Sequence, residues 1–167
     1  PARPKMGAEG NVVEAYIPKL TEMGHVHPVT ELFDNKKRKW GRWFRQSGAE
    51  VISPKTRVVM SGVGDLPLLM LDDVGKGRVA WLGSDHIWLW TRGFETGGPQ
   101  RELLRRLAHW LMKEPDLEEN KLSINVSGKE ITLRRRALLD VDQDTELIMH
   151  TPSGEEKPVI LSREMKR

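Results

Sequence analysis

Cysteine is absent from the 167 residues of this chain. Its absence excludes disulfide bonds, thiolate metal ligands and a cysteine nucleophile within the chain. Long hydrophobic runs are also missing, since no apolar stretch approaches the ~20 residues that a membrane-spanning helix needs. The first residues contain no apolar segment typical of a secretory signal peptide. Because the chain also lacks an initiating methionine, we expect it to be a piece of a longer protein.

The composition is that of a soluble globular protein, with 38% hydrophobic and 31% charged residues. This length predicts one domain or two small ones. The formal net charge of +3 is unevenly distributed, because residues 36–45 hold six cations and no acid: Lys36, Lys37, Arg38, Lys39, Arg42 and Arg45. Such a segment can attract nucleic acid, an anionic surface or a partner. We favour a solvated loop whose tryptophans pack inward.

Apolar runs at 66–71 and 78–82 flank a glycine-rich turn. They predict a β-hairpin that is buried on both faces, because the runs are continuously apolar. Further strands are expected at 12–17 and 57–61. A short helical turn capped by Thr30 is expected at 27–33.

Pro99 occupies the expected first position of a helix that ends before Pro115. Five apolar residues recur in it at helical spacing: Leu103, Leu104, Leu107, Ala108 and Leu111. They predict a helix face that lies on the sheet, and Arg106 is among the residues expected on the opposite face. We therefore expect residues 1–116 to be an α/β domain, α+β in the portion present here. Its core would be a mixed sheet with a flanking amphipathic helix.

The pattern changes after this helix. Period-2 alternation recurs in four short segments between 117 and 167, around Ile124, Ile131, Leu147 and Val159. This alternation predicts a small antiparallel β module. About fifty residues is marginal for a free-standing sandwich, so we expect the module to pack on the first domain or to continue in the longer protein.

Ser84, Asp85 and His86 supply the residue types of a hydrolytic triad. Neighbours on an extended segment point to opposite faces, so three consecutive residues cannot act as nucleophile, base and orienter. We favour a role in ending the strand and capping the next loop through local hydrogen bonds. Asp85, His86 and Trp88 nevertheless remain candidate pocket residues. Trp88 and Trp90 would share one face of an extended segment, and with Trp40 and Trp43 they could stack on a sugar or an aromatic ligand, or bury an interface with another part of the longer protein. Of these two roles for the tryptophans, we favour burial.

The histidines predict no metal site. His25 and His27 would share a face of an extended segment, but no third ligand is evident among the five histidines. The glycine-rich segment 93–98 lacks the spacing of a phosphate-binding loop, and Glu95 opposes an anion. We interpret it as a connection that needs glycine conformations. No cofactor is expected.

Several segments together resemble a family of large proteobacterial membrane proteins. These are His27-Pro-Val-Thr30, Trp40-Gly-Arg-Trp-Phe-Arg45, Pro67-Leu-Leu-Met-Leu71, Ser84-Asp-His-Ile-Trp-Leu-Trp90 and the stretch 97–115. Members carry a class I glutamine amidotransferase-like domain, often beside a von Willebrand factor A-like region and membrane helices. The resemblance covers residues 11–119, is most specific at 88–115, and implies the C-terminal part of the amidotransferase-like domain.

The resemblance does not carry over a catalytic role. Class I amidotransferases use a cysteine nucleophile with a His–Glu pair, whereas this chain has no cysteine and His86 lies in no His-x-Glu motif. The expectation is therefore a non-catalytic, periplasmic domain of a membrane-anchored bacterial envelope protein, acting in assembly or in ligand or partner recognition. Its partners would be the rest of that protein, other envelope proteins, or a second copy joined through an exposed sheet edge.

Two other functions stay open at this point. One is a hydrolase or amidotransferase whose nucleophile lies outside this chain, which requires His86 to face an open cleft. The other is nucleic-acid binding through residues 36–45, which would weaken steeply with salt.

Overall fold

The computed structural model describes residues 2–4, 10–33, 39–128, 130–138, 145–150 and 154–161. The chain forms two compact units, unit 1 (Pro1–Glu118) and unit 2 (Glu119–Arg167). Helices combine with several antiparallel sheets, which confirms the α+β class. Among the described residues, no helix has the length and apolar character needed to cross a bilayer.

A four-stranded sheet forms the centre of unit 1, in the order β3 (Lys19–Leu20), β6 (Arg57–Ser61), β7 (Pro67–Val74) and β8 (Gly77–Leu82). The strand at 57–61 and the β7–β8 hairpin are as predicted. Every recorded strand pair in the described part of the chain is antiparallel, so the expected mixed sheet is wrong. Short turns connect β6 to β7 and β7 to β8, and such turns favour antiparallel neighbours.

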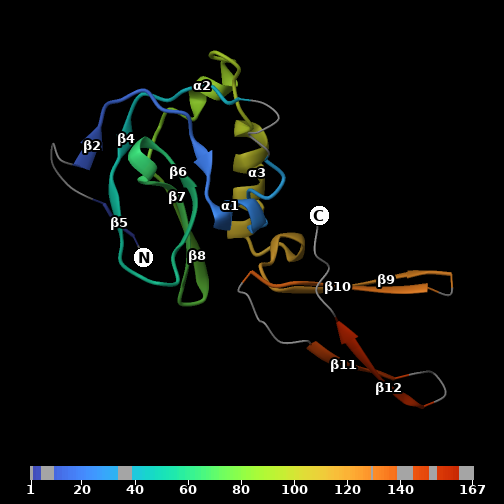
Figure 1. Ribbon diagram of the computed structural model, residues 1–167. Coiled ribbons are helices and arrows are strands. Elements are labelled where there is room, and N and C mark those ends of the chain that lie inside the picture. The colour runs from blue at the N-terminus through green and yellow to red at the C-terminus, as the bar shows by residue number, and fades with distance from the viewer. Residues whose placement is uncertain are drawn as a thin grey trace. The chain divides into compact units, whose positions relative to one another are not determined.

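Elements on both sides of the sheet bury its middle strand. Helix α3 (Gln100–Leu111) lies on one side, and β4 (Gln46–Ser47) and β5 (Ala49–Val51) lie on the other (Figure 1). Five consecutive β7 residues are consequently buried: Leu68, Leu69, Met70, Leu71 and Asp72. The prediction of two-sided burial is right for β7 and wrong for β8, because β8 is at the sheet edge and Val79 is 44% exposed.

Helix α3 packs through a face that only partly matches the expected one, since Leu103 lies in the core and Leu107 packs against it. Leu103, Arg106 and Trp110 are buried, whereas Leu104 and Leu111 are exposed. Arg106 points inward because the Pro28 and Val29 carbonyls accept hydrogen bonds from its Nε, at 2.9 and 3.3 Å. Pro99 is the N-cap residue and not the first helical residue.

Successive short strands in the N-terminal part of unit 1 pair with different partners. β1 (Ala2–Pro4) pairs with β5, and β2 (Asn11–Val12) pairs with β4. Tyr16 then makes a single bridge to Trp43. The strand expected at 12–17 is therefore interrupted, because no single partner strand runs beside it.

Helix α1 (Glu22–Val26) precedes the expected helical turn. Its N-cap is Thr21, whose Oγ1 accepts from the Gly24 N–H. Residues 27–33 do form turns, but Thr30 does not cap them, because its hydroxyl donates to the Gly24 carbonyl at 2.6 Å.

Tryptophans form much of the core of unit 1. Trp90, on α2 (Trp88–Thr91), packs against Trp40 and Trp43 with ring centroids 5.2 and 4.8 Å apart. All three are buried, as favoured from the sequence, and so is Trp110. Short 3₁₀ turns at Val63–Asp65 and Pro115–Leu117 complete the regular structure of this unit.

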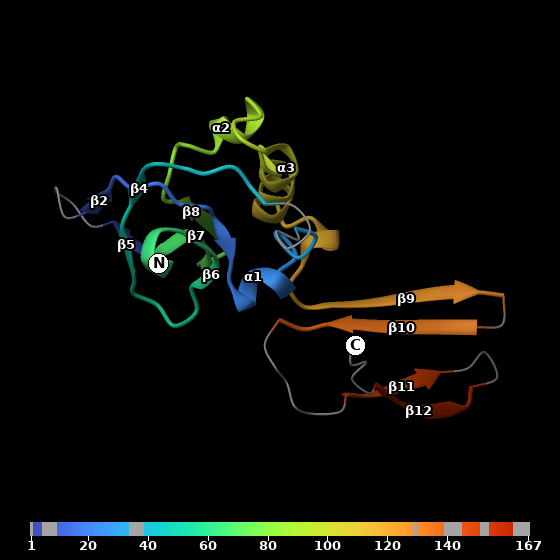
Figure 2. The same cartoon turned by 45° about the horizontal axis from the view of Figure 1, so that its top comes forward.

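Unit 2 contains two β-hairpins, as the alternation predicts. β9 (Lys121–Ser127) pairs with β10 (Glu130–Arg136), and β11 (Thr145–His150) pairs with β12 (Glu156–Leu161), as Figure 2 shows. The apolar side chains of β9 and β10 share one face by register and remain largely exposed, with Ile124 at 63% and Val126 at 64%.

Candidate functional site

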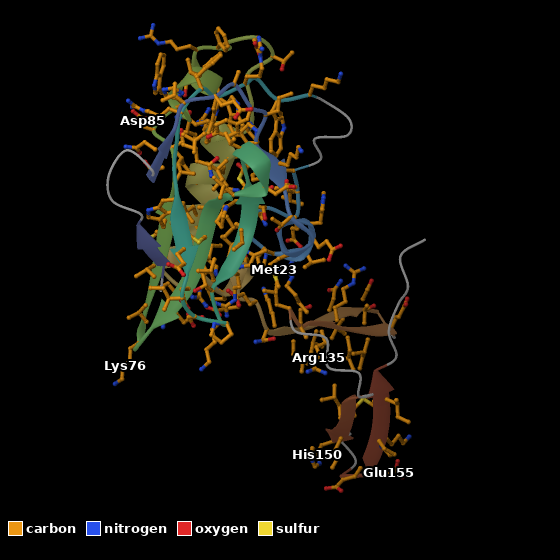
Figure 3. All side chains as sticks on the ribbon, turned by 60° about the vertical axis from the view of Figure 1, so that its left-hand side comes forward. Met23, Lys76, Asp85, Arg135, His150 and Glu155 are labelled. Carbon is orange, nitrogen blue, oxygen red and sulfur yellow. The ribbon has the colours of Figure 1, made fainter. Side chains whose placement is uncertain are left out.

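The segment that follows β8 is held from two sides by main-chain hydrogen bonds. The Gly83 N–H donates to the Leu68 carbonyl at 2.8 Å, and the Gly83 carbonyl accepts from the Ser47 N–H at 2.6 Å. A side chain at Gly83 would meet the Trp81 ring at 2.3 Å, so glycine is needed for this close approach. Asp85 lies just beyond the C-terminal end of β8, whereas Lys76 lies in the turn at the other end of the strand (Figure 3).

Ser84 is a structural residue by its contacts. Its hydroxyl donates to the Arg45 carbonyl at 2.6 Å and accepts from the His86 N–H at 3.1 Å. The Tyr16 hydroxyl donates to the same carbonyl at 3.3 Å. Ser84 thus contacts the backbone of His86 and not its imidazole, which is the local hydrogen bonding expected from the sequence.

The imidazole ring of His86 is oriented by the backbone and side chain of Phe44. The Phe44 N–H donates to Nδ1 of His86 at 3.0 Å, so the neutral imidazole carries its proton on Nε2. The two rings also meet edge to face, with centroids 6.3 Å apart. Nε2 lies 4.0 Å from Asp85 Oδ1. With Nδ1 accepting from an amide, His86 lacks the arrangement of a general base held by a carboxylate.

Asp85 forms an ion pair with Arg45 at the protein surface. Arg45 Nη2 lies 2.5 Å from Asp85 Oδ2, and the two side chains are 52% and 62% exposed. The hydrogen bond from Arg45 holds the pKa of Asp85 below its ordinary value, against the opposing effect of desolvation. Asp85 is therefore a carboxylate at neutral pH, and the pair as a whole is neutral.

A cleft of about 430 Å³ lies beside this ion pair, between the β2–β4 pair and the end of β8. Trp81 and Leu82 supply its apolar surface. Its polar surface includes Asn11 and Ser47, which are linked by a 2.9 Å hydrogen bond from the serine hydroxyl to the amide oxygen. We call it the β8 cleft; it is lined by Asn11, Arg45, Ser47, Trp81, Leu82, Gly83, Ser84 and Asp85.

Trp88 and Trp90 do not form the expected shared surface. Both lie on α2, where residues two positions apart face different directions, so Trp90 is buried and Trp88 is 50% exposed. Of the three candidate pocket residues, Asp85 lines the β8 cleft, His86 is adjacent to it in sequence, and Trp88 is not part of its lining.

The two arginines of the basic segment, Arg42 and Arg45, are engaged in ion pairs. Arg42 binds Glu95 in a bidentate manner, with its Nε 2.7 Å from Oε1 and its backbone N–H 2.9 Å from Oε2. The hydrogen bonds from Arg42 hold the pKa of Glu95 below its ordinary value. Arg45 pairs with Asp85, and the Lys39 carbonyl accepts from the Thr96 hydroxyl. Lys36, Lys37 and Arg38 lie outside the described residues.

The glycine-rich connection serves the same contact. Gly93 and Gly97 have φ angles of 69° and 64°, in the region that favours glycine. These conformations turn the loop so that Glu95 reaches Arg42. The interpretation of this segment as a conformational connection is confirmed.

The histidines lie in separate environments. His25 is on α1, while His27 is buried, accepts the Val29 N–H on Nδ1 at 3.1 Å and packs against Trp110. Within the described ranges, no group of three or more His, Cys, Asp or Glu residues is arranged to hold a metal ion.

Sequence reasoning missed three residues of the β8 cleft: Asn11, Ser47 and Trp81. No motif links them, because they lie on three strands that meet only in the folded unit. Trp81 was expected in the core, but it is half-buried because β8 is an edge strand. Comparison of the chain with protein-family models, curated proteins and solved structures finds no match.

Proposed function

We propose that this chain is a non-catalytic recognition domain of a membrane-anchored bacterial envelope protein, with an amidotransferase-like ancestry. The observation that carries the proposal is the engagement of residues 84–86 by the backbone of residues 44 and 45. The polar groups at the end of β8 are thereby fixed at the edge of an open cleft, where they can contact a ligand. Fold ancestry alone would not imply an activity.

The arrangement gives little support to hydrolysis. A general base needs a free lone pair directed at the group that it deprotonates. The Nδ1 lone pair of His86 already accepts the Phe44 amide, and Nε2 carries the proton of the neutral ring. The Ser84 hydroxyl is 2.6 Å from a carbonyl oxygen, to which it donates its only proton. These contacts favour binding over turnover.

Turnover assays test this proposal directly. The chain, and the longer protein that carries it, would be incubated with glutamine and with a short-chain ester, beside a His86→Ala variant. We expect no turnover above the buffer rate and no difference between the two proteins. Turnover that is lost in His86→Ala would overturn the proposal in favour of an enzyme whose nucleophile lies elsewhere.

The envelope location requires its own measurement. An epitope tag on the longer protein would be followed through fractionation of bacterial cells. We expect the tag in the membrane fraction, with this domain cleaved by protease once the outer membrane is permeable. A domain that remains protected until the inner membrane is broken would contradict the periplasmic assignment.

A further inference from the structure

The charge of the β8 cleft limits the ligands that fit it. Among the residues that the structure describes, its lining contains one cation, Arg45, and one anion, Asp85, and these two are paired at 2.5 Å. An anionic ligand that approaches Arg45 also meets the Asp85 carboxylate, and a cationic ligand meets the guanidinium. Desolvating an unpaired charge is costly. The lining therefore favours a ligand without net charge.

The polar groups of the cleft retain capacity for hydrogen bonds. A guanidinium has five N–H donors, and the described contacts of the Arg45 side chain use Nη2 alone. The Asn11 side-chain oxygen accepts from Ser47, which leaves the two amide N–H groups of Asn11 to donate and the Ser47 oxygen to accept. The lining thus offers donors and acceptors together. This combination suits hydroxyl groups, which donate and accept at once.

The apolar part of the cleft contains an aromatic ring. The far edge of the Trp81 ring lies over Gly83, where a Cβ would clash, and Leu82 also contributes to the lining. A pyranose ring has one face of C–H groups and an edge of hydroxyls, so it can place the first on the indole and the second against the polar groups. The volume of about 430 Å³ lies within the range of small-ligand sites, roughly 300–1,000 Å³.

We propose that the β8 cleft binds a neutral sugar, stacked on Trp81 and hydrogen-bonded by Asn11, Ser47 and the Arg45–Asp85 pair. This inference rests on the proposed recognition function and names its ligand class. The two can fail separately, because the function is tested by turnover and the ligand class by binding.

Binding to the full chain would be measured by ligand-observed NMR and by calorimetry. The probes are neutral monosaccharides and short oligosaccharides, including N-acetylglucosamine and its oligomers, with glucuronate and glucose 6-phosphate as charged counterparts. We expect saturable binding of a neutral sugar and at least about tenfold weaker binding of its charged counterpart. Failure of every neutral sugar to bind, or tighter binding of the charged probes, would overturn the inference.

Variants locate the binding. Trp81→Ala should abolish it, and Asn11→Ala should weaken it about tenfold, the effect of about 1.4 kcal/mol. Trp88→Ala is the matched control, because Trp88 is exposed and outside the cleft lining, and should bind as the unaltered chain does. Sugar binding that survives both Trp81→Ala and Asn11→Ala would place the ligand elsewhere and overturn the assignment.

A charge variant keeps the test independent of folding defects at Trp81. Asp85→Asn removes an exposed carboxylate and leaves Arg45 as the one charged side chain among the described residues of the lining. It should weaken neutral-sugar binding, because the Asp85 carboxylate is one of the proposed hydrogen-bond acceptors, and it should gain measurable binding of glucose 6-phosphate. If Asp85→Asn leaves the preference between neutral and charged sugars unchanged, the neutrality argument is wrong.

Discussion

Tyr16 is a single residue whose ionisation reports on the packing beneath the β8 cleft. Burial raises its pKa to about 12 from the ordinary 10.0, with smaller contributions from a lowering hydrogen bond of Ser84 and a raising charge of Asp85. The folded chain therefore holds this proton more tightly than the unfolded chain does. The stabilisation is complete below pH 10, and the free energy of unfolding should fall as pH rises from about 10 to about 12.

This prediction can be measured without a label, because Tyr16 is the only tyrosine of the chain. Tyrosinate absorbance should have its midpoint near pH 12 in the native protein and near 10 in denaturant. Tyr16→Phe is the control, since it should remove this part of the pH dependence. A native midpoint near pH 10 would mean that water reaches the phenol.

At the level of single residues, the sequence misleads where a polar side chain has a partner far along the chain. Arg106 was expected opposite the core face because arginine is usually exposed. It is buried because backbone carbonyls more than seventy positions earlier accept its N–H groups. Trp110 is buried beside Leu103, whereas Leu104 and Leu111 of the leucine pattern are exposed. Such pairings cannot be predicted from spacing within the helix.

Among the elements, the hairpin and α3 are joined by one buried cation. Arg78 of β8 donates to the Trp110 carbonyl at 2.8 Å and to Glu118 at 2.7 Å, and its guanidinium lies 4.8 Å from the centre of the Trp110 ring. Its side chain is only 7% exposed, and Asp73 lies 3.4 Å away. This set of contacts holds the C-terminal end of the helix on the edge strand.

Replacing Arg78 should consequently loosen that end of the helix. Arg78→Ala leaves Glu118 and the Trp110 carbonyl without this partner, and we expect a loss of about 3 kcal/mol in the free energy of unfolding. Chemical denaturation of the chain measures it. Arg105→Ala removes an exposed arginine from α3 and should leave the midpoint almost unchanged. Equal shifts for the two variants would show that burial of Arg78 is not what matters.

Elements with strong local patterns were predictable, and their partners were not. The strand Arg57–Ser61 and the hairpin around Gly75 follow from apolar runs and a turn. The segment at 12–17 has similar residues, yet only Asn11–Val12 forms a strand there. The reason is that the pairing partner changes along the segment, from β4 at Asn11–Val12 to Trp43 at Tyr16. Likewise, β8 is half-exposed because it lies at the edge of the sheet. These outcomes depend on which strands meet, and local composition does not contain that information.

On the scale of the whole molecule, the candidate site is a product of the tertiary fold. Asp85 could be singled out from its neighbours in sequence, but its partner Arg45 is forty positions away. Asn11, Ser47 and Trp81 carry no motif and converge only because β2, β4 and β8 lie together. A neutral cleft made from an acid and a base of distant segments also cannot be read from net charge.

The two units should differ strongly in stability, because their cores differ. Leu69 in β7 is fully buried, whereas Ile124 in β9 is 63% exposed, and two-stranded hairpins are marginal alone. We expect amide hydrogen exchange in β9–β12 to be at least about tenfold faster than in β6–β8, and denaturation in two steps. Unit 1 should unfold in the second step. Leu69→Ala should lower the free energy of unfolding of that step by about 3 kcal/mol, whereas Ile124→Thr should leave it unchanged. Equal protection of both units, with one shared transition, would mean that unit 2 depends on contacts that stabilise both together.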